Sequence, residues 1–272
     1  MDIGGASLLP LASRHTNELR VSQRIFFGAV ALVFAICAGS TVAWCLSMSI
    51  MPELPMPGGW SLSMTWAPVC GQKWPRMAVS FLGMWIVMMM AMMLPSLAPA
   101  LWRYHEVFDR TGAVRAHRLT ALMGMGYFFV WAVFGVVVFA SGFMFITLAM
   151  QLPALSRAVP AAASVVVLLA GALQFSAWKL RHLVCSRRVS MHDADSACMR
   201  GIRLGGRCIG CCAGLTAVLL VNGVMDLRAM TLVTLAITAE RLAPAPECIA
   251  RAVGVPVVVM GLSMLARAMG FL

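Results

Sequence analysis

Charged side chains are scarce in this chain, and acidic ones are the scarcest. Aspartate and glutamate supply only 10 residues against 21 lysines and arginines, so charged residues make up 11% of the 272 positions. With 61% hydrophobic residues and a mean hydropathy of +0.88, the chain has too little polar surface to cover a soluble globule. The composition excludes an ordinary soluble domain and predicts an integral membrane protein.

The sequence also lacks the motifs of several enzyme classes. It shows no internal repeat, P-loop, dinucleotide fingerprint or serine-hydrolase elbow. The absence of a phosphorylation loop and of membrane-embedded carboxylates argues against a pump or a proton-coupled antiporter. The sequence therefore favours a role that is not enzymatic.

Long apolar runs set the expected fold. A helix needs roughly 20 apolar residues to cross the hydrocarbon core, and several runs reach that length. We expect an all-α polytopic transmembrane bundle of about seven helices, of which the sixth is short. The first run exceeds a signal-peptide core and predicts an anchor. The expected helices are 25–47, 77–101, 120–150, 161–180, 208–227, 229–243 and 252–270. We divide the chain into a tail, first helix and outer loop (1–76), a core bundle (77–243) and a C-terminal helix (244–272).

The positive charge is distributed asymmetrically. In a soluble protein a net charge of +11 would suggest nucleic acid, but here it follows the bias of lysine and arginine toward cytoplasmic loops. With the N-terminus inside, 16 of the 21 basic residues fall on the inner side, leaving Lys73, Arg76, Arg157, Arg228 and Arg267 outside. We therefore predict a protein of the bacterial inner membrane with a cytoplasmic N-terminus and a periplasmic C-terminus. Its predicted surroundings are the lipid bilayer, and nucleic acid is not an expected partner.

Three of the nine cysteines stand within five residues, Cys208-Ile209-Gly210-Cys211-Cys212. On a helix, positions i, i+3 and i+4 share a face, so the three thiols are expected to converge at the N-terminus of the helix 208–227. That end of a helix favours thiolates, which bind metals, and structural disulfides are rare in the cytoplasm. The alternative is that these cysteines pack helices as small apolar residues.

Two further ligand types are candidates for the same site. His182 and Cys185 follow Gln174 and Trp178 at helical spacing in the helix 161–180, which offers an imidazole and a thiol together. Glu240 is the one carboxylate expected near the inner end of the short sixth helix. The alternatives are a headgroup contact for His182 and an ion pair with a neighbouring basic residue for Glu240.

Methionines form a stripe in the second helix, where Met84, Met88 and Met92 recur at i+4, with Met89 and Met93 in a second row. This MxxxM spacing resembles the selectivity motif of trimeric copper-uptake channels, although methionine is also a common filler of helix interfaces. The outer loop holds further methionines among its prolines, which predict either a Cu(I)-collecting loop or a lid at the membrane surface. These are Met48, Met51, Met56 and Met64.

These motifs together resemble a prokaryotic family of predicted metal-binding integral membrane proteins whose function is unassigned. The resemblance covers roughly residues 77–243. The family commonly has a cysteine where this chain has His182, an aromatic residue at Ala213 and asparagine at Asp226. The matching segments are Trp85–Ser96, Gly126-Tyr127 with Trp131, Gly171–Lys179, Arg203–Cys212, Gly223–Leu227 and Glu240-Arg241.

We therefore predict a soft-metal site that serves copper handling, delivery or passive transfer, with zinc as the second choice of metal. A metallochaperone or a recipient membrane protein is the expected partner. The alternatives are a membrane thiol–disulfide oxidoreductase and a structural or assembly subunit. The predicted metal ligands are Cys208, Cys211, Cys212, Cys185, His182, Met84, Met88, Met92 and Glu240.

Overall fold

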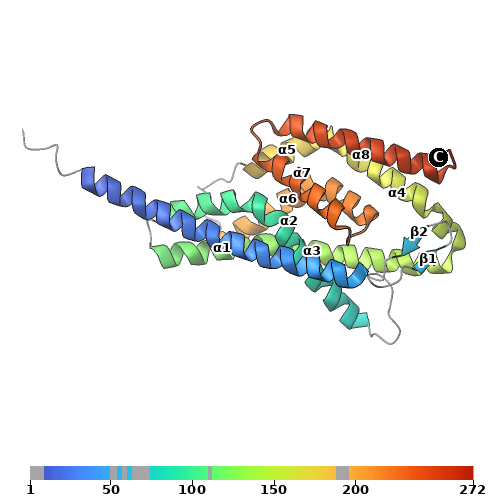
Figure 1. Ribbon diagram of the computed structural model, residues 1–272, viewed down its shortest axis with the longest axis horizontal. Coiled ribbons are helices and arrows are strands. Elements are labelled where there is room, and N and C mark those ends of the chain that lie inside the picture. Colours follow the sequence, from blue (N-terminus) through green and yellow to red (C-terminus); the bar gives the residue numbers. More distant parts are fainter. Residues whose placement is uncertain are drawn as a thin grey trace, which may run out of the picture.

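The computed structural model describes residues 9–49, 54–56, 60–62, 74–109, 112–187 and 196–271 (Figure 1). Within these ranges the chain forms eight helices and one short antiparallel hairpin, which confirms the predicted all-α bundle. The elements are α1 (Leu9–Ser49), β1 (Leu54–Met56), β2 (Trp60–Leu62), α2 (Trp74–Asp109), α3 (Ala113–Gln151), α4 (Pro153–Gln174), α5 (Ala177–Arg187), α6 (Ala197–Asn222), α7 (Leu227–Leu242) and α8 (Pro246–Ala268).

The eighth helix arises because the predicted helix 161–180 is two helices. The chain breaks at Phe175 and Ser176, where the backbone N–H of Phe175 bonds to the carbonyl of Ala172 and ends α4. The hydroxyl of Ser176 accepts a hydrogen bond from the N–H of Trp178 at the start of α5. Hydroxyl side chains commonly satisfy the free N–H groups of a first helical turn. Gln174 therefore lies on α4, whereas Trp178 and His182 lie on α5.

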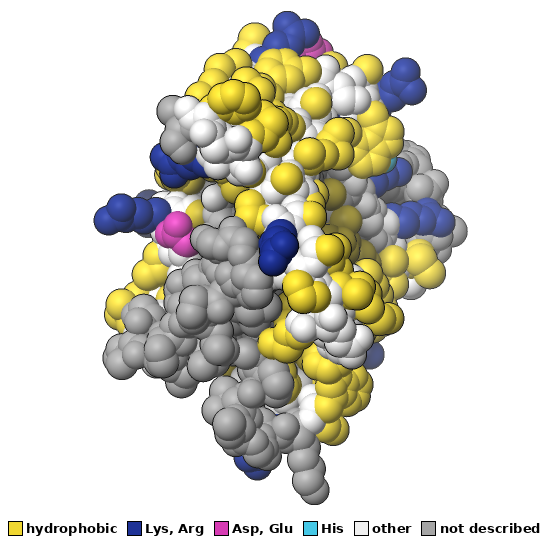
Figure 2. Space-filling model, turned by 90° about the vertical axis from the view of Figure 1, so that its right-hand side faces the viewer, with side chains coloured by type: hydrophobic (Ala, Val, Ile, Leu, Met, Phe, Trp, Pro, Cys, Tyr) yellow, Lys and Arg dark blue, Asp and Glu magenta, His cyan; other side chains and the backbone are white. Residues whose placement is uncertain are grey.

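Six helices are long and apolar enough to cross a membrane, which supports the membrane character of the protein. They are α1, α2, α3, α4, α6 and α8. The helix α7 has 16 residues and is only about 24 Å long, against about 30 Å of hydrocarbon. On the face drawn in Figure 2, hydrophobic side chains form broad areas and the lysines and arginines are scattered. The bacterial inner membrane and the orientation of the termini remain predictions.

The helix α6 occupies the centre of the bundle, in contact with α3, α4, α5 and α7 (Figure 1). Glycines allow α3 and α6 to approach closely, because a Cβ at Gly126 or Gly201 would overlap the backbone of the other helix. Small residues at such crossings are typical of membrane helices. Tyr127 directly follows Gly126 on α3, and Cys208 lies about two turns beyond Gly201 on α6; both are fully buried. The close crossing thus brings their side chains together.

The helix that carries the cysteines starts earlier than predicted. It begins at Ala197, where the hydroxyl of Ser196 accepts a hydrogen bond from the N–H of Met199 and caps it. Cys208 lies eleven residues, about 16 Å, from that start. The prediction of a helix N-terminus at the thiols was wrong, because helical structure continues through a segment rich in arginine that the sequence presented as a loop.

Some expectations fall outside the described residues. Met51 and Met64 of the outer loop do so, as does the side chain of Met56, so a copper-collecting loop remains a prediction. The same holds for the side chain of Cys185 on α5.

Candidate metal centre

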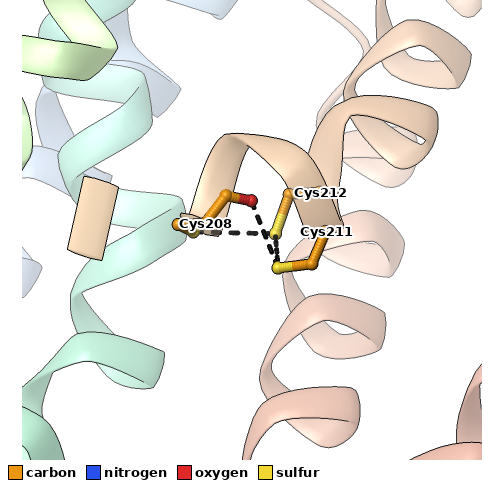
Figure 3. Close-up of side chains that lie close together, drawn as sticks. All are labelled: Cys208, Cys211 and Cys212. Atoms are coloured by element: carbon orange, nitrogen blue, oxygen red, sulfur yellow. Dashed lines mark hydrogen bonds between the residues drawn. The ribbon is translucent and has the colours of Figure 1, made fainter. Parts of the chain in front are cut away.

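The thiols of Cys208, Cys211 and Cys212 converge inside the bundle. Their sulfur atoms all lie within 4.8 Å of one another, and this triad is the one potential metal-binding group of three or more His, Cys, Asp and Glu residues found within the described part. Cys208 and Cys212 are 3.7 Å apart, and Cys211 and Cys212 are 3.5 Å apart (Figure 3). The exposed fractions are 0%, 3% and 1% in chain order. The predicted convergence on one helix face is thus confirmed.

The spacing of the sulfur atoms is close to that of a metal–thiolate site. Thiolate sulfurs at about 2.3 Å from one metal ion are separated by about 3.8 Å in tetrahedral and about 4.0 Å in trigonal geometry. The two measured separations, 3.5 and 3.7 Å, lie just below this range. All three separations are at most 4.8 Å, so small side-chain adjustments would bring the three sulfurs to coordination distances.

A buried arginine faces the triad from another helix. Nη1 of Arg241, on α7, donates to Sγ of Cys208 at 3.2 Å, to the hydroxyl of Tyr127 at 3.4 Å and to the hydroxyl of Ser96 at 3.1 Å. Arg241 is only 8% exposed. The hydroxyl of Tyr127 also donates to Cys208, at 3.0 Å. Two donors from α3 and α7 therefore point at one thiol of α6.

A methionine from α2 also lies against Cys208. Sδ of Met93 is 4.0 Å from Sγ of Cys208, and Met93 and its neighbour Met89 are fully buried. The predicted stripe of Met84, Met88 and Met92 is also buried. It is nevertheless Met93, from the second row, whose sulfur makes the contact with Cys208. The methionine-rich face of α2 therefore reaches the triad through a residue that was not among the predicted ligands.

His182 and Glu240 are held by groups outside the triad. Nδ1 of His182 is 2.9 Å from the carbonyl of Trp178, and its ring packs against Gly210, next to Cys211 in the chain. The carboxylate of Glu240 forms a buried ion pair with Lys179 at 2.8 Å. This pair matches the alternative of a basic partner, although the partner is on α5. Neither residue belongs to the group of converging sulfur ligands.

Sequence reasoning missed Arg241, Tyr127 and Met93 as neighbours of the thiols. A signal existed, since an arginine after an apolar stretch is costly to bury unless it meets a partner. The pairing depends on how α3 and α7 pack against α6, because Tyr127 and Arg241 are 81 and 33 residues away from Cys208 along the chain. The spacing of residues within one helix does not reveal contacts between residues that are so far apart in the sequence.

Chemically, the arrangement offers three buried thiols with a thioether close by and a fixed positive charge at one thiol. Thiolate and thioether are the soft ligands that select Cu(I). The donor set therefore fits a soft metal ion better than a hard one.

Comparison with known proteins agrees with this chemistry. No curated protein and no solved structure matches the chain. The model of the PpoB2 family, described as a copper chaperone, matches residues 82–264. The match covers about two thirds of the chain, from α2 into α8, and includes the triad and Arg241. It shows a copper-related family, while the prokaryotic class of predicted metal-binding membrane proteins that the sequence resembles remains a prediction. The chain belongs to the PpoB2 family of copper chaperones.

Proposed function

We propose that the protein binds Cu(I) inside the membrane as a complex with the thiolates of Cys208, Cys211 and Cys212, and passes the ion to a recipient without hydrolysing a nucleotide. The observation that carries this proposal is the buried guanidinium of Arg241 against Cys208 in a cluster whose ligands are all sulfur. The PpoB2 family match supports it independently.

The charge of Arg241 is the first argument. A guanidinium stays protonated in proteins, and a buried one is costly unless an anion compensates it. Among the residues that the structure describes, the guanidinium donates to two neutral hydroxyls and a thiol, those of Ser96, Tyr127 and Cys208. Three thiolates around Cu(I) carry a net charge of −2, which would supply the missing anion.

The type and number of ligands favour copper over zinc. Structural zinc sites are almost always four-coordinate, and their fourth ligand is a cysteine, histidine or carboxylate. The triad supplies three thiols, and the additional sulfur ligand beside it is the thioether of Met93, 4.0 Å from Cys208. A thioether is a soft ligand that suits Cu(I), so zinc is the second choice.

The remaining predicted ligands are assigned roles around this complex. We assign His182 to the approach to Cys211 from α5, and Met84, Met88 and Met92 along α2 as weaker ligands on the path of the ion. Cys185 stays a predicted ligand from the sequence. Glu240 fits better as the partner that neutralises Lys179. The expected recipient is a metallochaperone or another protein of the bacterial inner membrane.

The oxidoreductase alternative is less well supported by the burial of the thiols. Disulfide exchange needs a thiolate that the sulfur of a partner protein can reach. None of the three thiols is more than 3% exposed, which prevents direct attack by a folded partner. A small ligand or a bare ion meets no such restriction.

A competition titration with a chromophoric Cu(I) chelator tests the proposal on the purified full-length protein. We expect one tightly bound Cu(I) per chain, and its loss in the double variant Cys211→Ser, Cys212→Ser. The matched control is Cys198→Ser, Cys248→Ser, because both of these cysteines are exposed and lie outside the triad. Full copper stoichiometry in the first variant would contradict the proposal. Elemental analysis of protein purified without added metal separates copper from zinc.

A further inference from the structure

A cavity of about 200 Å³ between α4, α5 and α6 leads from the surface to the triad. Its lining includes Gln174 and Trp178, and on α6 Gly210, Cys211 and Gly214. Trp178 is 47% exposed, whereas Cys211 is 3% exposed. The cavity therefore connects an accessible residue on α5 with a buried thiol of the metal centre.

Glycines on α6 keep this space open. A side chain at Gly210 would collide with the ring of His182, so the glycine allows that ring to pack beside Cys211. At Gly214 an added Cβ would meet the carbonyl of Ala170 at 3.4 Å, which is an ordinary contact. A small side chain at position 214 is thus tolerated, and a larger one would extend into the cavity.

A buried amide at the cavity lacks an acceptor. Lys179 donates to Oε1 of Gln174, which fixes the amide orientation because a flipped amide would place its NH₂ against the ammonium group. Nε2 of Gln174 is buried and forms no hydrogen bond within the described part of the chain, and Gln174 is only 4% exposed. Buried donors are nearly always satisfied. A ligand with a negatively charged oxygen or sulfur in the cavity would satisfy this one.

We propose that this cavity is the port through which a low-molecular-weight thiol bearing a carboxylate exchanges Cu(I) with Cys211. This proposal rests on the proposed function. The volume corresponds to about seven molecules of liquid water, at about 30 Å³ each, which accommodates a thiol of cysteine size but not a folded partner.

The exchange balances without any change of oxidation state. When copper leaves, the sulfur of a first incoming thiol binds Cu(I), its proton passes to Sγ of Cys211, and the bond between copper and Sγ of Cys211 breaks. The bonds to Cys212 and Cys208 are then exchanged in the same way, each for one further thiol whose proton passes to the released cysteine. The reverse steps load the ion. Cu(I) is neither oxidised nor reduced.

The test fills the cavity with Gly214→Leu and uses Gly206→Leu as the matched control. Gly206 lies on the same helix, and an added Cβ there meets no atom within 4 Å. Each full-length variant is loaded with Cu(I) in detergent, and the transfer of copper to L-cysteine is followed with a chromophoric chelator. We expect the transfer rate to fall by about ten-fold or more in Gly214→Leu at unchanged stoichiometry, and to stay at the wild-type value in Gly206→Leu.

Wild-type transfer rates in Gly214→Leu, or equal slowing in both variants, would contradict the proposal that the cavity is a port. The proposal that the protein binds copper would be unaffected. Absence of bound copper in the wild-type protein would instead refute the proposed function. If Gly214→Leu lowers the copper stoichiometry through misfolding, Gly214→Ala replaces it, since its Cβ fits at an ordinary distance. A smaller slowing at full stoichiometry supports the port, and no slowing overturns it.

Discussion

Arg241 distinguishes this cluster from three cysteines that only fill space between helices. Its guanidinium lies 3.2 Å from Sγ of Cys208 and is buried with it. A packing role for the cysteines does not require a cation at that position, because a thiol is an adequate apolar filler. The placement of a permanent charge there is explained when the sulfur ligands carry negative charge.

Replacing Arg241 by methionine, which has an unbranched side chain without charge, should weaken Cu(I) binding by about 10- to 100-fold. Hydrogen bonds to charged groups contribute about 1.5 to 3 kcal/mol, and the anionic complex would lose one of them. Arg241→Lys should recover part of the affinity because it keeps the charge. Competition titration of both variants provides the measurement. If the methionine variant binds Cu(I) as tightly as the wild-type protein, the charge has no part in the site.

The sequence was sufficient to predict the convergence of the thiols, because three residues at i, i+3 and i+4 share a face on any helix. It was insufficient for Arg241, Tyr127 and Met93. Each of these comes from a different helix. The contact of Tyr127 depends on the close crossing of α3 and α6 at Gly126 and Gly201, and the other two depend on how α2 and α7 pack into the bundle.

At the scale of elements, the limits of the helices were harder to predict than their existence. The first turns of α6 carry Arg200, Arg203 and Arg207, which suggest a loop by composition. The cap at Ser196 and the packing of α6 against α3 stabilise them as helix. The break between α4 and α5 was missed for the opposite reason, since the apolar run continues through Phe175 without a proline or glycine at that position.

The methionine rows of α2 allow a prediction about the path of the ion. Because Met93 touches Cys208, we expect the double variant Met89→Leu, Met93→Leu to slow copper loading of membrane vesicles from the face nearer the start of α2. The variant Met88→Leu, Met92→Leu should slow it less. Such swaps nearly conserve volume and usually cost under about 1.5 kcal/mol, so the fold should persist.

Initial rates of Cu(I) uptake in right-side-out and inside-out vesicles provide the measurement for both pairs. Loading from the opposite face does not pass the start of α2, so it serves as the internal control and should not change. Wild-type rates from both faces in both variants would show that these methionines pack helices and do not conduct copper.

At the scale of the whole molecule, the number of membrane crossings determines on which side each terminus lies. The structure has six candidate spans, and an even number of crossings would place both termini on one side. The short helix α7 changes this count. Its residue Arg241 contacts Cys208 in the interior of α6, while its first residue follows α6 after a turn of only a few residues. The helix α7 therefore runs antiparallel to α6 and returns the chain toward the side from which α6 started.

The accessibility of two native cysteines tests whether α7 returns the chain across the membrane. Cys198 stands at the start of α6 and Cys248 at the start of α8, and both are exposed. If α7 returns the chain, both lie on the same side, which the distribution of arginines predicts to be the cytoplasm. A cysteine introduced at the exposed Leu152, between α3 and α4, should lie on the periplasmic side.

Single-cysteine variants that keep only Cys198, only Cys248 or only Leu152→Cys test this with a membrane-impermeant thiol reagent. In intact cells the reagent should label the cysteine at position 152 and neither of the native ones, and all three should react once the membrane is opened. A variant without any cysteine controls for background. Labelling of Cys198 with protection of position 152 would invert the orientation. Different accessibility of Cys198 and Cys248 would show that α7 does not return the chain, and the C-terminus would then share the side of the N-terminus.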